Sequence, residues 1–291
     1  MIPVVLRSLC GSGRATFLVA ATICLCCVFA GCSTSRPSAT ARTGLTILER
    51  AAAAGFVRRG VETSIGTLQI WHKGLGSGDV IDVYIEGDGR AWASRTRPSN
   101  DPTPTNPVAF ELALKDTTQA VLYVARPCQY QADKQDAACD QRYWTSHRYG
   151  ETVVAAIDEV LEQLISPRPA TALQLIGFSC GGTLAALLAT RRSDVVSLTT
   201  VAGNLDIDAW AKHHRVTPLS GSLNPANFRS QLQHIPQRHL VGAEDTVVPA
   251  ELTRDFAARL GSVSLNIESF AGFDHGCCWS RVWPQALVGK P

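Results

Sequence analysis

The feature that most constrains this chain is a serine between two glycines, in the stretch 173–183 (LQLIGFSCGGT). The apolar run 173–176 predicts a strand, and the run 183–189 predicts a helix. Between them, Gly177 and Gly181 flank Ser179 at a distance of two residues, and glycine permits sharp turns and close backbone approach. The pattern predicts a strand, a tight turn and a helix, with the Ser179 hydroxyl presented at the helix N-terminus. The alternative is a glycine-rich turn whose serine only caps the helix.

The first 31 residues have the pattern of an export signal. Arg7 and Arg14 precede an uncharged apolar stretch, 15–30, which is short for a membrane span. The small residues before Cys32 resemble a bacterial lipobox, in which the cysteine is acylated, and Ser33 suggests, by analogy, the outer membrane. We therefore expect a lipoprotein-type signal peptide and a lipid anchor at Cys32, with the protein in the cell envelope facing the periplasm. An ordinary cleaved signal peptide and an uncleaved anchor are the alternatives.

The rest of the chain divides by composition. Residues 32–44 are rich in Ser, Thr, Pro and Ala, cannot bury a core, and are expected to form a flexible tether. Residues 45–291 suit a single domain. Loss of the signal lowers the 27 Lys and Arg residues to 25, which equals the 25 Asp and Glu residues. A chain without net charge gives no electrostatic reason to expect nucleic-acid binding.

Hydrophobic periodicity predicts an α/β fold. A stripe of apolar residues predicts a helix over 151–165, and helical patterns also cover 45–59, 183–192 and 250–260. Alternating or continuous apolar runs predict strands over 67–73, 80–86, 120–125, 195–201, 238–241 and 263–270. Strands that alternate with helices indicate a mostly parallel central sheet with helices on both faces.

Two long loops interrupt this pattern. The loop 87–106 begins with Gly-Asp-Gly, and loops of this length in a domain are usually functional or disordered. The loop 126–150 contains Cys128 and Cys139, which in an oxidising envelope are expected to form a disulfide. Two free thiols are the alternative.

A serine hydroxyl needs a general base within hydrogen-bond reach, and that base needs a carboxylate that fixes its tautomer. Ser179, Asp245 and His275 occur in this order, and each follows a predicted strand. All three are therefore expected at the carboxyl edge of the sheet, where open α/β sheets bind ligands. Asp206 or Asp208, after the preceding strand, could supply the carboxylate instead.

Three segments resemble the α/β-hydrolase superfamily: Gly-Phe-Ser-Cys-Gly at 177–181, the acid loop at 242–249 and the histidine loop at 272–275. The resemblance covers roughly residues 67–279. It implies the α/β-hydrolase fold and a catalytic triad, in which Ser179 is the nucleophile, His275 the general base and then acid, and Asp245 the orienting carboxylate.

The resemblance also implies an oxyanion hole. The backbone N–H of Cys180, the residue after the nucleophile, would be one donor, and Asp88 or Gly89 in the first long loop would provide the other. A plain Gly-Asp-Gly turn is the alternative for that loop.

Several disulfide pairings are possible for the last three cysteines, Cys180, Cys277 and Cys278. Cys180 could form a disulfide with Cys277 or Cys278, the two adjacent cysteines could pair with each other, or all three could be small buried apolar residues. A zinc site with His275 is least favoured, because the spacing matches no usual ligand pattern.

The sequence therefore predicts an exported serine hydrolase that cleaves an ester through an acyl-enzyme, with a small acyl compound as substrate. No nucleotide motif or metal-ligand pattern occurs, and we expect no cofactor and no metal. A peptidase or acyltransferase with the same triad is the first alternative. A non-catalytic envelope lipoprotein that uses the fold for binding is the second, because fold alone does not imply activity. The oligomeric state does not follow from the sequence.

Overall fold

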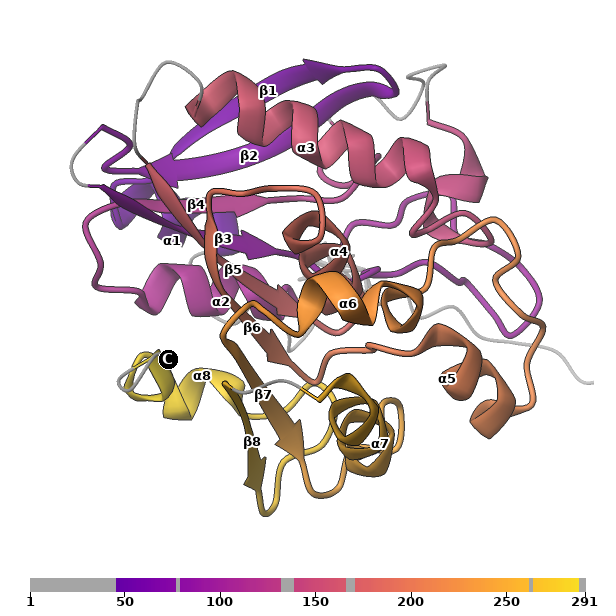
Figure 1. The fold of residues 1–291 in the computed structure, drawn as a ribbon. Helices are drawn as coiled ribbons and strands as arrows, with labels where there is room; N and C mark the ends of the chain where they lie inside the picture. The colour runs from indigo at the N-terminus through magenta and orange to yellow at the C-terminus, as the bar shows by residue number, and fades with distance from the viewer. Residues whose placement is uncertain (1–45, 77–78, 132–138, 166–170, 262–263, 288–291) are drawn as a thin grey trace, which may run out of the picture. The chain divides into compact units, whose positions relative to one another are not determined.

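One sheet organises the computed structural model, which describes residues 46–76, 79–131, 139–165, 171–261 and 264–287 (Figure 1). The described strands lie in the order β1-β2-β4-β3-β5-β6-β7-β8. The β1–β2 and β2–β4 pairs are antiparallel and all other pairs are parallel. The strands are β1 (Val57–Thr63), β2 (Gly66–Lys73), β3 (Val80–Ile85), β4 (Val121–Val124), β5 (Ala172–Phe178), β6 (Val195–Val201), β7 (Gln237–Gly242) and β8 (Leu265–Phe270). The expected mostly parallel sheet is confirmed.

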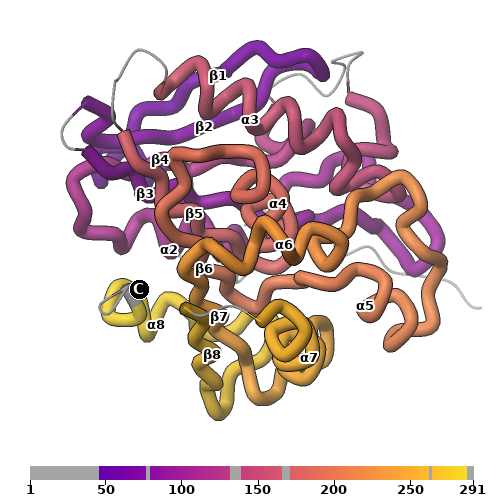
Figure 2. The backbone as a smooth tube through the Cα atoms, viewed as in Figure 1, coloured from indigo at the N-terminus to yellow at the C-terminus, as the bar shows by residue number. Residues whose placement is uncertain are grey.

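Helices cover both faces of this sheet and bury a separate apolar core on each (Figures 1 and 2). One core contains residues of α3, α4, α6 and α7, and the other contains residues of α1, α2 and α8. The helices are α1 (Ile47–Ala53), α2 (Val108–Lys115), α3 (Glu151–Ile165), α4 (Cys180–Ala189), α5 (Ile207–His214), α6 (Arg229–Leu232), α7 (Ala250–Leu260) and α8 (Trp279–Val282). Short 3-10 helices are η1 (Gln141–Trp144), η2 (Pro225–Phe228) and η3 (Gln285–Leu287). None of the described helices is both long enough and apolar enough to cross a bilayer.

The helix predicted over residues 45–59 is wrong in its second half. α1 ends at Ala53, and Gly55 has φ +80, which closes the helix and turns the chain. Val57 then begins the edge strand β1, which pairs along its length with β2. Of this strand only Val61 is buried, so its sequence lacks the alternation by which a half-buried strand is recognised.

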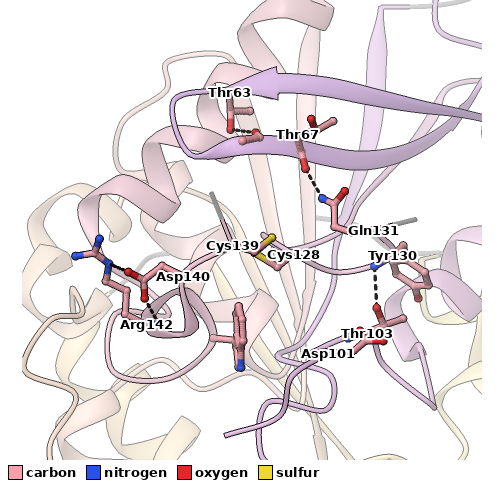
Figure 3. Close-up of a disulfide and its surroundings, with 12 residues drawn as sticks. Thr63, Thr67, Asp101, Thr103, Cys128, Tyr130, Gln131, Cys139, Asp140 and Arg142 are labelled. Atoms are coloured by element: carbon pink, nitrogen blue, oxygen red, sulfur yellow. Dashed lines mark hydrogen bonds and ion pairs between the residues drawn. A yellow bond between two sulfur atoms is a disulfide. The ribbon is translucent and has the colours of Figure 1, made fainter. Parts of the chain in front are cut away.

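The second long loop is closed by a disulfide between Cys128 and Cys139, as expected (Figure 3). Cys128 packs with Ala91 and Trp144, so the bridged loop lies against the loop 87–106. The Trp144 indole donates to the Ser99 carbonyl at 3.1 Å. Chain-entropy estimates give about 3 kcal/mol of stabilisation for a loop of this size. The second loop is therefore closed covalently, and it contacts the first loop through packing and a hydrogen bond.

The signal peptide expected at residues 1–31, Cys32 and the tether at 32–44 lie outside the described residues. The described chain belongs to one compact unit, Leu45–Pro291.

A buried histidine in β7 makes stability dependent on pH. Burial lowers the pKa of His239 to about 3 from an ordinary value of 6.5, because the charged imidazolium would lose its hydration. The unfolded chain therefore binds a proton at this residue below about pH 6.5, whereas the folded chain binds it only near pH 3. The stability that the neutral ring contributes is complete above pH 6.5 and is lost as the pH falls through this window.

We expect His239→Asn, which keeps a partner for the Thr200 hydroxyl, to gain stability relative to the unmodified protein as the pH falls. The gain should reach about 1.4 kcal/mol per pH unit between pH 6.5 and 3. Urea unfolding at several pH values measures it, with the exposed His234→Asn as the control. A difference between His239→Asn and the unmodified protein that stays constant with pH would contradict this assignment.

Candidate active site

The turn around Ser179 has the strained geometry that its glycines predict. β5 ends at Phe178 and α4 begins at Cys180, while Ser179 between them has φ +51, a conformation that non-glycine residues rarely adopt. A Cβ on Gly181 would lie 2.1 Å from the Ile85 carbonyl oxygen, and one on Gly177 would lie 2.3 Å from that of Gly181. Only glycine fits at both positions, so the sharp turn at the helix N-terminus is built into the sequence.

The structure brings together the three side chains that the sequence predicts as a triad. His275 Nε2 lies 2.9 Å from Ser179 Oγ, and His275 Nδ1 lies 2.8 Å from Asp245 Oδ2. The Asp245 side chain is fully buried, and that of His275 is 20% exposed. With the Nδ1 proton donated to the carboxylate, Nε2 is free to accept the serine proton. This arrangement makes the hydroxyl a candidate nucleophile.

Asp245 is held in place by the loop that carries it. Its Oδ1 accepts hydrogen bonds from the backbone N–H groups of Val247 and Val248, each at 2.8 Å. The Val247 carbonyl in turn accepts a hydrogen bond from the Trp210 indole at 2.7 Å and contacts His214 Nε2 at 2.9 Å, both on α5. Oδ2 is therefore the oxygen left to face the histidine.

The alternative carboxylates do not contact His275. Asp206 Oδ2 accepts a hydrogen bond from Arg259 at 2.8 Å, and its Oδ1 caps α5 by accepting from the Ala209 N–H. Asp208 accepts a hydrogen bond from Asn224 at 2.9 Å. Both residues stabilise the start of α5, so their role is structural.

The histidine loop is fixed by its own hydrogen bonds. Asp274 Oδ1 accepts from the Gly276 N–H at 3.0 Å and the Cys277 N–H at 2.6 Å. The buried Trp279 donates from its indole to the His275 carbonyl at 3.0 Å. The backbone that carries the imidazole is thus anchored to the start of α8.

Besides Cys128 and Cys139, the described part of the chain contains three cysteines, which form one pair and one free thiol. Cys277 and Cys278 are joined to each other, whereas Cys180 is free and buried. Tyr149 donates its hydroxyl proton to the Cys180 sulfur at 2.7 Å. Burial, with a further contribution from Asp88, raises the pKa of the Cys180 thiol. Cys180 therefore stays a neutral thiol and leaves nucleophilic chemistry to Ser179.

A small cavity of about 190 Å³ opens beside the serine. Ser179, His275 and Phe178 line one part of it, and Asp88 and Gly89 line another. The loop expected to contribute to an oxyanion hole is therefore at the serine. The Cys180 N–H, at the first position of α4, has no acceptor within its helix. It remains a candidate donor for an anionic oxygen.

Sequence reasoning missed Glu86, which also lines this cavity. Its carboxylate accepts hydrogen bonds from the Gly87 N–H at 2.9 Å and the Tyr123 hydroxyl at 3.0 Å, and from the Phe110 N–H at 3.3 Å. Burial raises the pKa of Glu86 to about 7, although these hydrogen bonds oppose the shift. The residue fastens the turn 87–89 to the N-terminus of α2. An acidic residue at the end of an apolar strand was the available signal.

Neither a protein-family model nor a curated protein sequence matches this chain. Several solved structures are similar to this chain. An esterase of Pyrococcus furiosus has a TM-score of 0.55 and 16% sequence identity, with 84% of this chain and 92% of the esterase covered. An acylaminoacyl peptidase of Pyrococcus horikoshii has a TM-score of 0.54 and 13% identity, with 76% of this chain and 38% of the peptidase covered.

A puromycin-hydrolyzing peptidase of Mycobacterium tuberculosis has a TM-score of 0.54 and 16% identity, with 77% of this chain and 37% of the peptidase covered. The chain thus spans most of the esterase and less than half of the two peptidases. At these identities the likeness concerns the fold. The chain has the α/β-hydrolase fold, as the resemblance of its three segments implied.

Proposed function

We propose that this protein is a serine hydrolase that cleaves carboxylic esters through an acyl-enzyme formed on Ser179. The observation that carries the proposal is the continuous hydrogen-bonded relay from Asp245 through His275 to the Ser179 hydroxyl. His275 would take the serine proton as Oγ attacks the carbonyl carbon, and would return it to the leaving alcohol. Water would then attack the acyl-enzyme by the same path. Asp245 would stabilise the imidazolium without taking its proton.

The oxyanion of each tetrahedral intermediate would be bound by backbone N–H groups. Cys180 begins α4, whose N-terminal dipole favours negative charge, and the turn at Asp88 and Gly89 borders the same cavity. No metal is needed in this scheme, because the developing charge is met by amides.

The size of the cavity favours a small acyl group. Pockets for drug-sized ligands have volumes of roughly 300–1,000 Å³, whereas the cavity at Ser179 has about 190 Å³. An acetyl to butyryl group fits within this space, whereas a long fatty acyl chain would extend beyond it into solvent. The P. furiosus esterase supports an ester as the substrate class, because it shares the fold over most of both chains.

A series of p-nitrophenyl esters from acetate to palmitate tests the proposal. We expect hydrolysis with the highest kcat/KM at two to four acyl carbons. Release of p-nitrophenol at the same rate by the protein and by Ser179→Ala would refute a serine mechanism. Addition of an alcohol or amine acceptor separates hydrolysis from acyl transfer, because a transferase would form the new ester or amide.

We further propose that the protein is exported and held in the outer membrane through acylated Cys32, facing the periplasm. The charged, apolar and small-residue segments of 1–32 support this. Metabolic labelling with a palmitate analogue tests it. We expect the label on the full chain and its loss in Cys32→Ser, together with release of that variant from the membrane fraction.

A further inference from the structure

A buried cluster of side chains lies behind the serine turn and has no part in the triad. It contains Arg148 and Tyr149, just before α3, with Asp88 from the turn after β3 and Cys180 from the start of α4. The Arg148 side chain is 8% exposed. A guanidinium is costly to bury unless it is paired, so its partners indicate what it is there to hold.

Arg148 is bound on several sides. Its Nη1 donates to Asp88 Oδ2 at 2.8 Å, and its Nε donates to the Thr145 carbonyl at 2.8 Å. Burial alone would lower the pKa of Arg148, but interactions with Tyr149, Asp88 and Cys180 outweigh it and hold the pKa above its ordinary value. The group is therefore a permanent cation with a planar, directional set of donors.

The two partners of interest come from different elements. Asp88 belongs to the turn that borders the cavity, and Cys180 follows Ser179 directly. For the oxyanion, the proposed function uses the backbone N–H of Cys180 and one from the turn at Asp88 and Gly89. Tyr149, the residue after Arg148, provides the contact with Cys180, because its hydroxyl donates to the Cys180 sulfur at 2.7 Å. Arg126 lies over the Tyr149 ring at 5.6 Å. Arg126 also donates to the Arg148 carbonyl.

We infer that Arg148 is a positioning residue that sets the spacing of the oxyanion hole, because its guanidinium holds the Asp88 side chain while the adjacent Tyr149 holds that of Cys180. The inference rests on the proposed serine hydrolysis. A tetrahedral oxyanion needs donors placed about 3 Å away before it forms, and a shift of about 1 Å costs about 100-fold in rate. Two adjacent residues, Arg148 and Tyr149, each hold one donor residue and so fix the separation of the two. The two residues keep their amides whatever their side chains are, so the effect is one of position.

Arg148→Lys and Arg148→Met test this in the full chain. Lysine keeps the charge but has no fork with which to hold Asp88 and the Thr145 carbonyl together. We expect kcat for a short-chain ester to fall about 10- to 100-fold, with KM changed less than about threefold. Affinity for an alkylboronic acid, which binds Ser179 Oγ as a tetrahedral adduct, should fall by the same factor. Methionine should lower both quantities further.

Arg192→Lys is the matched control, because this guanidinium is also mostly buried and pairs with Asp158 and Asp194 away from the serine. It should keep kcat and boronate affinity. Thermal unfolding is measured for every variant. Asp88→Asn weakens the contact with Arg148, and Cys180→Ala removes the contact with Tyr149. Both leave the backbone amide in place, so they report on the same arrangement if the Arg148 variants do not fold. Asp88→Asn combined with Arg148→Lys should lose no more than the more severe single variant.

The inference is overturned if these variants keep kcat and boronate affinity in an active enzyme, or if only KM rises. It is also overturned if Arg192→Lys loses as much activity as Arg148→Lys. The proposed function stands in each of these cases, because the unmodified protein hydrolyses ester. If the unmodified protein shows no Ser179-dependent hydrolysis, the function and the inference fall together.

Discussion

Ser179→Ala should reduce ester hydrolysis by about 10⁴- to 10⁶-fold, while the protein stays folded. The physical reason is that His275 Nε2, 2.9 Å from Ser179 Oγ, would then face a methyl group and would have no hydroxyl to activate. Loss of one buried hydroxyl has a small effect on stability in comparison. Steady-state rates with p-nitrophenyl butyrate and a thermal unfolding curve measure the two effects. Ser230→Ala, at an exposed position on α6, should keep full activity.

The opposite result for this pair would be informative. If Ser179→Ala keeps its rate, the strained turn at +51° is only a structural connection between β5 and α4. Ser179→Ala could instead lose both its activity and its cooperative unfolding transition. Circular dichroism then shows whether the activity is lost because the variant does not fold or because the nucleophile is missing.

Asp245→Asn should lower kcat by about 10⁴-fold with little change in KM. Asp245 Oδ1 accepts two backbone N–H groups, so an asparagine would keep its oxygen there and turn its NH₂ toward His275 Nδ1. The imidazole would then carry its proton on Nε2, where it cannot accept one from Ser179. The pH dependence of kcat and the kcat/KM split are the readouts.

Asp206→Asn is the matched control for this carboxylate. Asp206 follows β6 and pairs with Arg259, so its neutralisation leaves the relay intact. We expect its kcat to stay within about threefold of the unmodified protein, since no reacting group touches it. Equal losses of kcat in Asp206→Asn and Asp245→Asn would contradict the assignment of Asp245 as the carboxylate of the triad.

The sequence was most informative where local chemistry dictates the backbone. Gly177 and Gly181 allow one tight turn, because a Cβ at either position would meet a carbonyl oxygen. Asp245 and His275 each follow a buried or half-buried strand, and parallel strands bring their carboxyl ends to one edge. The triad could therefore be predicted from strand order, residue type and the resemblance of three segments to the α/β-hydrolase superfamily, with Asp206 and Asp208 left as alternatives to Asp245.

Other features depend on packing that the sequence does not display. β1 was missed because it is an edge strand whose only buried residue is Val61. Arg148 and Glu86 were missed because their partners are brought together only by tertiary structure: Asp88 lies 60 residues before Arg148. The pairing of Cys180, Cys277 and Cys278 was open for the same reason, since several disulfides among them were compatible with the spacing.

A fluorophosphonate probe tests the central claim most directly, because it modifies a serine only when a base activates it. Peptide mass analysis of the labelled full chain should place a single adduct on Ser179. The adduct should be absent in Ser179→Ala and should form far more slowly in His275→Asn. An unlabelled chain, or labelling that persists in Ser179→Ala, would contradict the account.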